Sequence, residues 1–170
     1  MDDAIAAMRS GRVAEAGDLV DELVRLDPDR GEGWSLRGLL ALDAYGDLRI
    51  ARESYENALA RGASVTFRLM HDHGTPQQFC VGTLLLTPAE VQFNADAGND
   101  RFRAPYAGIR EAGINSVYGS QVGMFHLRVT LSDGSKNFNF AVLRSADQRV
   151  VNRKPDAELL LHLLNQRRSP

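Results

Sequence analysis

Two histidines separated by one residue, His71 and His73, have the spacing in this chain that most suggests a chemical site. Residues two apart on an extended strand point to the same face, so both imidazoles can reach one metal ion. Cys80 or His126 would be the third ligand of such a zinc site. Zinc sites need three or four converging ligands, and spacing secures only two. The sequence therefore favours a polar strand edge over a metal site, keeps His71 and His73 as candidate zinc ligands, and predicts no cofactor.

The sequence gives even less support for a catalytic cysteine or a phosphate-binding loop than for a metal site. Cys80 lies in the apolar segment Phe79-Cys80-Val81, which predicts a small buried hydrophobic residue rather than a nucleophile. The glycines lack the Gly-x-x-x-x-Gly-Lys and Gly-x-Gly-x-x-Gly spacings of phosphate-binding loops. Because no acid, base and nucleophile converge by spacing, we expect a protein that is not an enzyme.

Charge and composition limit the partner and the compartment. Residues 1–63 hold eight basic and thirteen acidic side chains and residues 64–170 hold twelve and nine, so the two parts carry formal charges of −5 and +3. Neither part has the dense positive field that nucleic-acid binding requires. The single cysteine allows no internal disulfide, and the N-terminus has Asp2 and Asp3 where a secretory signal has Lys or Arg. We expect a cytoplasmic protein.

Apolar residues recur every three or four positions over four segments in the first third of the chain, the spacing of amphipathic helices. These segments are residues 4–8, 13–26, 33–42 and 48–61. Two registers in them repeat one spacing, which marks stacked helical hairpins. The registers are Ala16-Val20-Leu23-Pro28 and Ala51-Tyr55-Ala58-Ala63. Small residues are predicted where the helices cross, because larger side chains would push the axes apart; they are Ala16, Gly38, Ala51 and Ala58.

This pattern resembles the tetratricopeptide repeat over residues 1–62, through Trp34, Gly38, Ala51, Tyr55 and Ala58. One residue more than the family pattern allows lies between Gly38 and Ala51, and we expect it in the turn at residues 43–46. The resemblance implies a protein or peptide partner bound along a concave groove, and the residues expected on that groove are Arg30, Arg37, Leu40 and Ala41.

After Ser64 the periodicity changes to alternation, which predicts seven strands. Their ranges are residues 65–71, 79–86, 90–94, 101–103, 109–118, 124–131 and 136–143. Asp133-Gly134 predicts a hairpin turn, and Lys154-Pro155 opens an apolar C-terminal helix.

Seven antiparallel strands followed by one helix outline a pleckstrin-homology (PH) domain, and residues 64–168 resemble the PH and GRAM-like domains of bacterial proteins. The segments that carry the resemblance are residues 80–86, 91–93, Phe102 with Ile109, 125–127 and 137–140. The expected fold class is α+β, with repeat-like helical hairpins followed by a seven-stranded β-sandwich or barrel. A small open barrel and a lipocalin-like fragment are the alternatives.

Many PH domains bind phosphoinositides through Lys and Arg in the first strand connection, but residues 71–78 contain neither. A basic patch on adjacent strands is a second candidate anion site, formed by Arg101, Arg103, Arg128 and Lys136. We favour a solvated rim that balances the acidic helices over an anionic partner or membrane surface.

Two functions remain open from the sequence. The first is a non-enzymatic adaptor that binds a protein or peptide partner through its helical repeats. The second is an accessory or regulatory region of a larger signalling enzyme, such as a kinase, with weak binding to anionic lipid.

Overall fold

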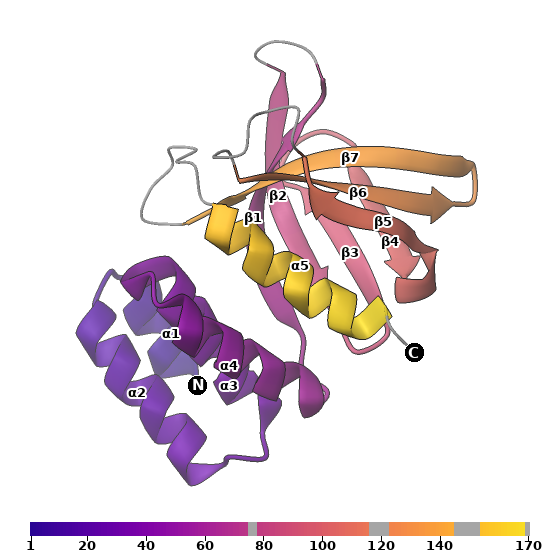
Figure 1. Cartoon of the computed structure of the whole chain (residues 1–170). Coiled ribbons are helices and arrows are strands. Elements are labelled where there is room, and N and C mark those ends of the chain that lie inside the picture. Colours follow the sequence, from indigo (N-terminus) through magenta and orange to yellow (C-terminus); the bar gives the residue numbers. More distant parts are fainter. Residues whose placement is uncertain (75–77, 116–122, 145–153, 169–170) are drawn as a thin grey trace. The chain divides into compact units, whose positions relative to one another are not determined.

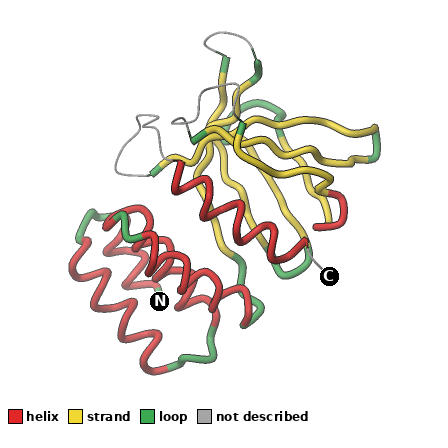
Figure 2. Tube along the Cα trace, viewed as in Figure 1, coloured by secondary structure: helices red, strands yellow, loops and turns green. Residues whose placement is uncertain are grey.

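The structure is a computed structural model that describes residues 1–74, 78–115, 123–144 and 154–168. The chain divides into two compact units, Met1–Val65 and Thr66–Pro170. The first unit is helical and the second consists of strands and one described α-helix (Figure 2). Secondary structure changes between Ala60 and Val65, where the periodicity of the sequence also changes. No helix among the described residues is both long and apolar enough to cross a bilayer.

Four α-helices form the first unit, and neighbours in sequence pack on one another (Figure 1). They are α1 (Asp2–Arg9), α2 (Val13–Leu26), α3 (Gly31–Leu40) and α4 (Leu48–Ala60). Pro28 lies between α2 and α3, as expected of a residue that has no amide hydrogen to donate. The side chain of Asp47 begins α4 by accepting a hydrogen bond of 2.9 Å from the Ile50 amide. The helix ranges agree with the apolar periodicity of the sequence.

Helix α3 continues directly into one π-helical turn, η1 (Ala41–Tyr45), which ends at Gly46 with a left-handed φ of 67°. A π turn takes up more residues than an α turn. It therefore accommodates the extra residue between Gly38 and Ala51. The sequence placed that residue in a turn at residues 43–46, whereas the structure keeps residues 41–45 helical.

Gly38 of α3 faces the ring of Tyr55 on α4 at very short range. A Cβ atom built on Gly38 would lie 2.4 Å from Tyr55 Cδ1, and Tyr55 is fully buried. Ala16, Ala51 and Ala58 are also fully buried. The prediction of small residues at the helix contacts is therefore confirmed at Gly38, where no other side chain fits without moving a buried ring.

Gly38→Ala is expected to lower the free energy of unfolding of the helical unit by about 1 to 3 kcal/mol, because overpacking outweighs the gain of about 1 kcal/mol in helix propensity. Trp34 is the only tryptophan and lies in α3, so its fluorescence during urea denaturation measures this unit. Gly33→Ala is the control on the same helix, since its added Cβ would meet nothing closer than 3.5 Å. A stabilised Gly38→Ala protein, or equal losses in both variants, would contradict the packing.

The second unit contains one seven-stranded antiparallel sheet with the order β4-β3-β2-β1-β7-β6-β5. The strands are β1 (Val65–Asp72), β2 (Phe79–Leu86), β3 (Glu90–Ala95), β4 (Arg101–Pro105), β5 (Ile109–Ile114), β6 (Met124–Leu131) and β7 (Gly134–Leu143). A short 3-10 helix, η2 (Tyr106–Gly108), connects β4 to β5, and the chain's last described element is α5 (Lys154–Arg168).

The sheet curves back on itself, because β4 contacts β6 although five positions separate them in the strand order. Helix α5 packs on β5, β6, β7 and η2 (Figure 1). Its buried leucines include Leu160, Leu163 and Leu164. A bent seven-stranded antiparallel sheet with a C-terminal helix fits the PH-like outline expected from the sequence. The α+β class is confirmed.

Two strands differ from the prediction. The strand expected at residues 109–118 ends at Ile114, and residues 116–118 lie outside the described residues. Strand β7 begins at Gly134 rather than at Lys136, because Leu131 pairs with Gly134 and only Ser132 and Asp133 form the turn. The predicted hairpin is present, and the two-residue turn extends its strands.

Candidate functional site

A cavity of about 430 Å³ opens on the helical unit, and we call it the helical groove. Its apolar lining comes from three elements, with Val20 from α2, Leu40 and Ala41 from the α3–η1 segment, and Ile50 from α4. The charged residues that line it are Asp18, Asp21, Arg37 and Asp47. Three carboxylates and one guanidinium leave the groove with an excess of negative charge.

Arg37 is held in place by two neighbours. Its Nε donates a hydrogen bond of 2.9 Å to Asp21 Oδ1, and its guanidinium lies 5.7 Å from the centroid of the Trp34 ring. The Trp34 indole donates a hydrogen bond of 2.8 Å to the carbonyl of Pro28. These contacts hold the Arg37 guanidinium, the only cationic group among the lining residues of the groove, against Asp21 of α2.

The structure brings together three of the four predicted protein-binding residues. Arg37, Leu40 and Ala41 line the helical groove, and Leu40 and Ala41 are buried in its wall. Arg30 is not among the lining residues and forms an exposed ion pair of 3.5 Å with Glu32. Sequence reasoning missed the acidic residues and Tyr45, because their convergence depends on how α2 packs on α3.

Tyr45 lies in the groove as a consequence of the π turn. Its hydroxyl donates a hydrogen bond of 3.2 Å to the carbonyl of Val13, and a Cβ atom built on Gly17 would lie 2.8 Å from that hydroxyl oxygen. The ring remains 57% exposed. One inserted residue thus places an exposed aromatic ring beside the apolar lining.

Two of the four residues of the predicted basic patch form ion pairs with acidic neighbours. Arg101, Arg103 and Lys136 line a second cavity of about 840 Å³ on the β unit, and Arg128 does not. Arg103 forms an ion pair of 2.5 Å with Glu90, and Lys136 forms one of 2.6 Å with Asp133. Within the described part of the chain, Arg101 alone of these three cations has no ion pair. Whether this surface balances the acidic helices or binds an anion stays a prediction.

A third cluster lies where β1 meets β2. The amide of His73 donates a hydrogen bond of 3.1 Å to the carbonyl of Gln78, and Arg68 Nη1 donates one of 2.9 Å to Thr83 Oγ1. Both contacts fit one antiparallel register, in which His71 stands opposite Cys80. The hairpin therefore brings the two predicted histidines beside the only cysteine of the chain.

Asp100 completes this cluster from the turn between β3 and β4. The Ala95 amide donates a hydrogen bond of 2.9 Å to the Asp100 carbonyl, and Ala95 pairs with Gly82 of β2. A Cβ atom built on Gly82 would lie 2.4 Å from the Asn94 carbonyl oxygen. Glycine at this position therefore allows the close approach of β3 that carries Asp100 towards Cys80.

The four side chains converge on a small volume, and their ligand atoms all lie within 4.8 Å of one another. Asp100 Oδ2 lies 3.4 Å from His73 Nε2, 3.7 Å from His71 Nδ1 and 3.6 Å from Cys80 Sγ. Cys80 Sγ lies 3.6 Å from His71 Nδ1. We call His71, His73, Cys80 and Asp100 the β1–β2 cluster.

Aromatic side chains hold the imidazole of His71 in place. Its ring centroid lies 5.1 Å from that of Phe140, 5.5 Å from that of Phe138 and 5.8 Å from that of Phe93. The His71 side chain is 9% exposed, whereas those of His73 and Asp100 are 32% and 39% exposed. The cluster thus has one buried, packed member and members that solvent reaches.

The surroundings favour neutral forms of His71 and Cys80. Burial, followed by the neighbouring His73, lowers the pKa of His71. Burial, followed by the hydrogen bond and charge of Asp100, raises the pKa of the Cys80 thiol to about 11. A thiol with a raised pKa is a poor nucleophile at neutral pH.

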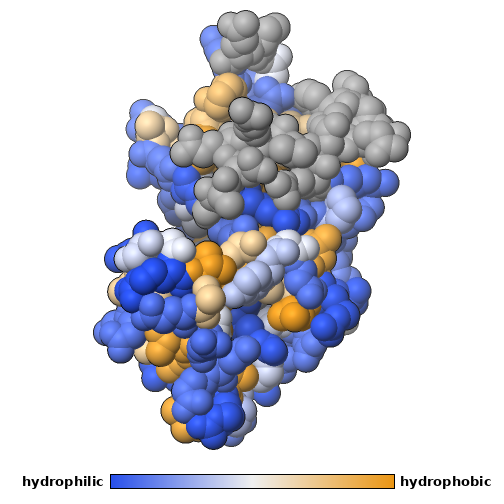
Figure 3. Space-filling view, turned by 90° about the vertical axis from the view of Figure 1, so that its left-hand side faces the viewer, coloured by the Kyte–Doolittle hydropathy of each residue, from blue (hydrophilic) through white to orange (hydrophobic). Residues whose placement is uncertain are grey.

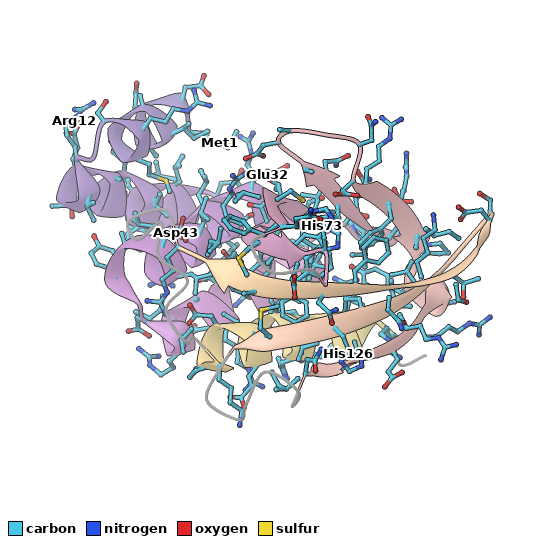
Figure 4. All side chains as sticks on the ribbon, turned by 90° about the horizontal axis from the view of Figure 1, so that it is seen from above. Met1, Arg12, Glu32, Asp43, His73 and His126 are labelled. Carbon is cyan, nitrogen blue, oxygen red and sulfur yellow. The ribbon has the colours of Figure 1, made fainter. Side chains whose placement is uncertain are left out.

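The structure bears on two expectations from the sequence, the burial of Cys80 and the choice of a third ligand beside the histidines. Cys80 is partly exposed and contacts polar groups, so it is not the buried apolar residue that the segment Phe79-Cys80-Val81 predicted. His126, the other candidate third ligand, lies away from His73 and forms an ion pair of 3.1 Å with Glu111 (Figure 4). Of the two candidate third ligands, the structure brings Cys80 to the two histidines, and it adds Asp100, which the sequence did not suggest.

Comparison with known proteins gives loose structural similarities only. No protein-family model matches the chain, and no curated protein matches it. Among solved structures, the C-terminal domain of an unknown protein from Leishmania infantum aligns at 14% identity and a TM-score of 0.44, covering 69% of this chain and 96% of that one. The N-terminal PH domain of human ARAP2 aligns at 11% identity and a TM-score of 0.43, covering 63% and 80%. Neither similarity bears on function.

Proposed function

We propose that this chain is a non-enzymatic protein-binding module whose helical unit, a tetratricopeptide-like pair of hairpins, receives a peptide segment in the helical groove. The observation that carries the proposal is the groove itself, an open cavity with apolar walls and acidic edges. Its volume of about 430 Å³ falls within the range of about 300 to 1,000 Å³ that is usual for binding pockets. A module of this kind serves as an adaptor.

The lining of the groove indicates the chemistry of the peptide. Val20, Leu40 and Ile50 offer a surface for one large apolar side chain such as Leu or Phe. Asp18 is exposed, and among the described residues it has no ion pair, so it is available to a cation of the ligand. We therefore expect a segment in which Lys or Arg adjoins a large apolar residue.

One face of the chain favours a peptide ligand rather than a partner that docks through a broad apolar surface. The face that Figure 3 shows is largely hydrophilic, and its apolar residues lie in separate small patches. A peptide that inserts one or two side chains matches such a surface better than a flat apolar partner.

A catalytic role for the β1–β2 cluster is not part of the proposal. Cys80, His71 and Asp100 have the residue types of a nucleophile, a base and an orienting carboxylate. Reactive cysteines have a lowered pKa, however, and the carboxylate beside Cys80 contributes to raising its pKa to about 11.

A peptide array probed with the full chain tests the proposed function. Peptides that pair Leu or Phe with Arg or Lys are expected to bind, and matched peptides with Asp or Glu are not. Asp18→Lys is expected to weaken binding by about tenfold, since it reverses a charge in the groove.

Glu22→Lys is the matched control, because it makes the same charge change on α2 outside the groove and removes only an exposed pair with Arg25. An array without preference for basic peptides, or equal losses in Asp18→Lys and Glu22→Lys, would refute the assignment of the groove.

A further inference from the structure

We propose that His71, His73, Cys80 and Asp100 form a four-ligand zinc site that joins strands β1 and β2 to the turn before β4. Ligand atoms at the corners of a tetrahedron lie about 3.3 to 3.8 Å apart when zinc bonds measure about 2.0 to 2.3 Å. Four of the six separations among these atoms are 3.4, 3.6, 3.6 and 3.7 Å, and the other two, from His73 to His71 and to Cys80, do not exceed 4.8 Å. Four of the six separations therefore fall in the range of a zinc tetrahedron, and the other two both involve His73, whose side chain is 32% exposed.

The donor set selects the metal class. Two imidazole nitrogens, one thiolate and one carboxylate oxygen suit zinc, whereas calcium and magnesium prefer sites made of oxygen ligands. Two neutral histidines, a thiolate and a carboxylate carry a total charge of −2, which balances Zn²⁺. The thiol of Cys80 releases its proton to solvent as the zinc–sulfur bond forms.

Four protein ligands leave no open coordination position, which is the arrangement of structural rather than catalytic zinc sites. The ligands come from the end of β1, the start of β2 and the turn before β4. Zinc would thus fasten these three segments to one another through their side chains, in addition to the backbone hydrogen bonds of the sheet. The packing of His71 on Phe93, Phe138 and Phe140 presents one ligand in a fixed orientation before the metal arrives.

Titration of the full chain with metal tests the site without any variant. The protein is treated with a chelator under metal-free reducing conditions and titrated with ZnCl₂ in a calorimeter. We expect one Zn²⁺ per chain with a Kd of about 1 μM or tighter, and a higher melting temperature. Replacing zinc by Co²⁺ is expected to give the visible bands of tetrahedral cobalt together with a sulfur-to-cobalt charge-transfer band.

Since Cys80 is the only cysteine, a charge-transfer band identifies it as a ligand. In NMR spectra, zinc is expected to shift the imidazole resonances of His71 and His73 and to leave those of His126 in place. The absence of saturable zinc binding, a cobalt spectrum without the sulfur band, or unshifted His71 and His73 resonances would each overturn the proposal.

Variants then assign the remaining ligand. Cys80→Ser and Asp100→Asn keep the shapes of their side chains and are expected to weaken zinc binding by at least about tenfold. Losing a residue that only hydrogen-bonds to a metal ligand usually costs about that much, and losing a ligand itself costs more. His126→Gln and Asp133→Asn alter a histidine and an aspartate of the same unit outside the cluster, and both are expected to bind zinc as the unmodified chain does. Equal affinity in Asp100→Asn and the unmodified chain would remove Asp100 from the site and overturn the four-ligand assignment.

Discussion

Phe140→Ala is expected to lower the free energy of unfolding of the β unit by about 3 to 5 kcal/mol. The Phe140 side chain is fully buried in β7. Its ring centroid lies 4.9 Å from that of Phe93, 5.7 Å from that of Phe125 and 5.1 Å from that of His71. Removing this ring leaves a cavity among side chains from several strands, which cannot all move inward together.

Amide hydrogen exchange of the β strands measures this loss, because the only tryptophan reports on the other unit. Phe140→Leu keeps most of the apolar volume and is expected to cost less than Phe140→Ala. Phe79→Ala is the exposed control, since Phe79 is 60% accessible, and its expected change is within about 0.5 kcal/mol. A loss below about 1 kcal/mol in Phe140→Ala would show that this ring does not support the core.

Periodicity predicted most of the elements of this chain. The alternation of Phe125-His126-Leu127 matches the observed burial in β6, where Phe125 and Leu127 are fully buried and His126 is not. The spacing at which apolar residues recur depends on the local backbone geometry and on which face of the element meets the core. A short stretch of sequence is enough to show this spacing. Element types and approximate ranges could therefore be read from the sequence.

The β1–β2 cluster could be predicted only in part. His71 and His73 share a face because they are two residues apart on one strand. Cys80 joins them because of the hairpin register, and Asp100 because of the pairing of β2 with β3. Register is set by turns and by packing over the whole sheet, so no local spacing pointed to Asp100.

The helical groove shows the same limit. Arg37, Leu40 and Ala41 were expected on a binding surface because they share a helix with the repeat-like residues Trp34 and Gly38. The π turn that places Tyr45 there was visible only as one surplus residue between Gly38 and Ala51. The length of an insertion can be counted in the sequence, but whether it becomes a loop or a π turn depends on the packing of neighbouring helices.

The second large effect is expected from the ion pair between Arg144 and Asp156, which joins the residue after β7 to the first turn of α5. Arg144 Nε and Nη2 donate hydrogen bonds of 2.8 and 2.6 Å to the two oxygens of Asp156. Their side chains are only 13% and 2% exposed. Asp156→Ala would leave the guanidinium without its partner in a poorly hydrated position. The expected loss in free energy of unfolding is about 3 to 5 kcal/mol.

Glu158→Ala is the control for this prediction, since it removes the exposed pair with Lys154 on the same helix, and its expected effect is below about 1 kcal/mol. Replacing both partners, as Arg144→Met with Asp156→Leu, is expected to recover most of the stability lost in Asp156→Ala, because no charge is then left buried. Hydrogen exchange of α5 and β7 amides measures all three proteins. If the double variant were as unstable as Asp156→Ala, the loss would come from the missing attachment of α5 rather than from an unpaired buried cation.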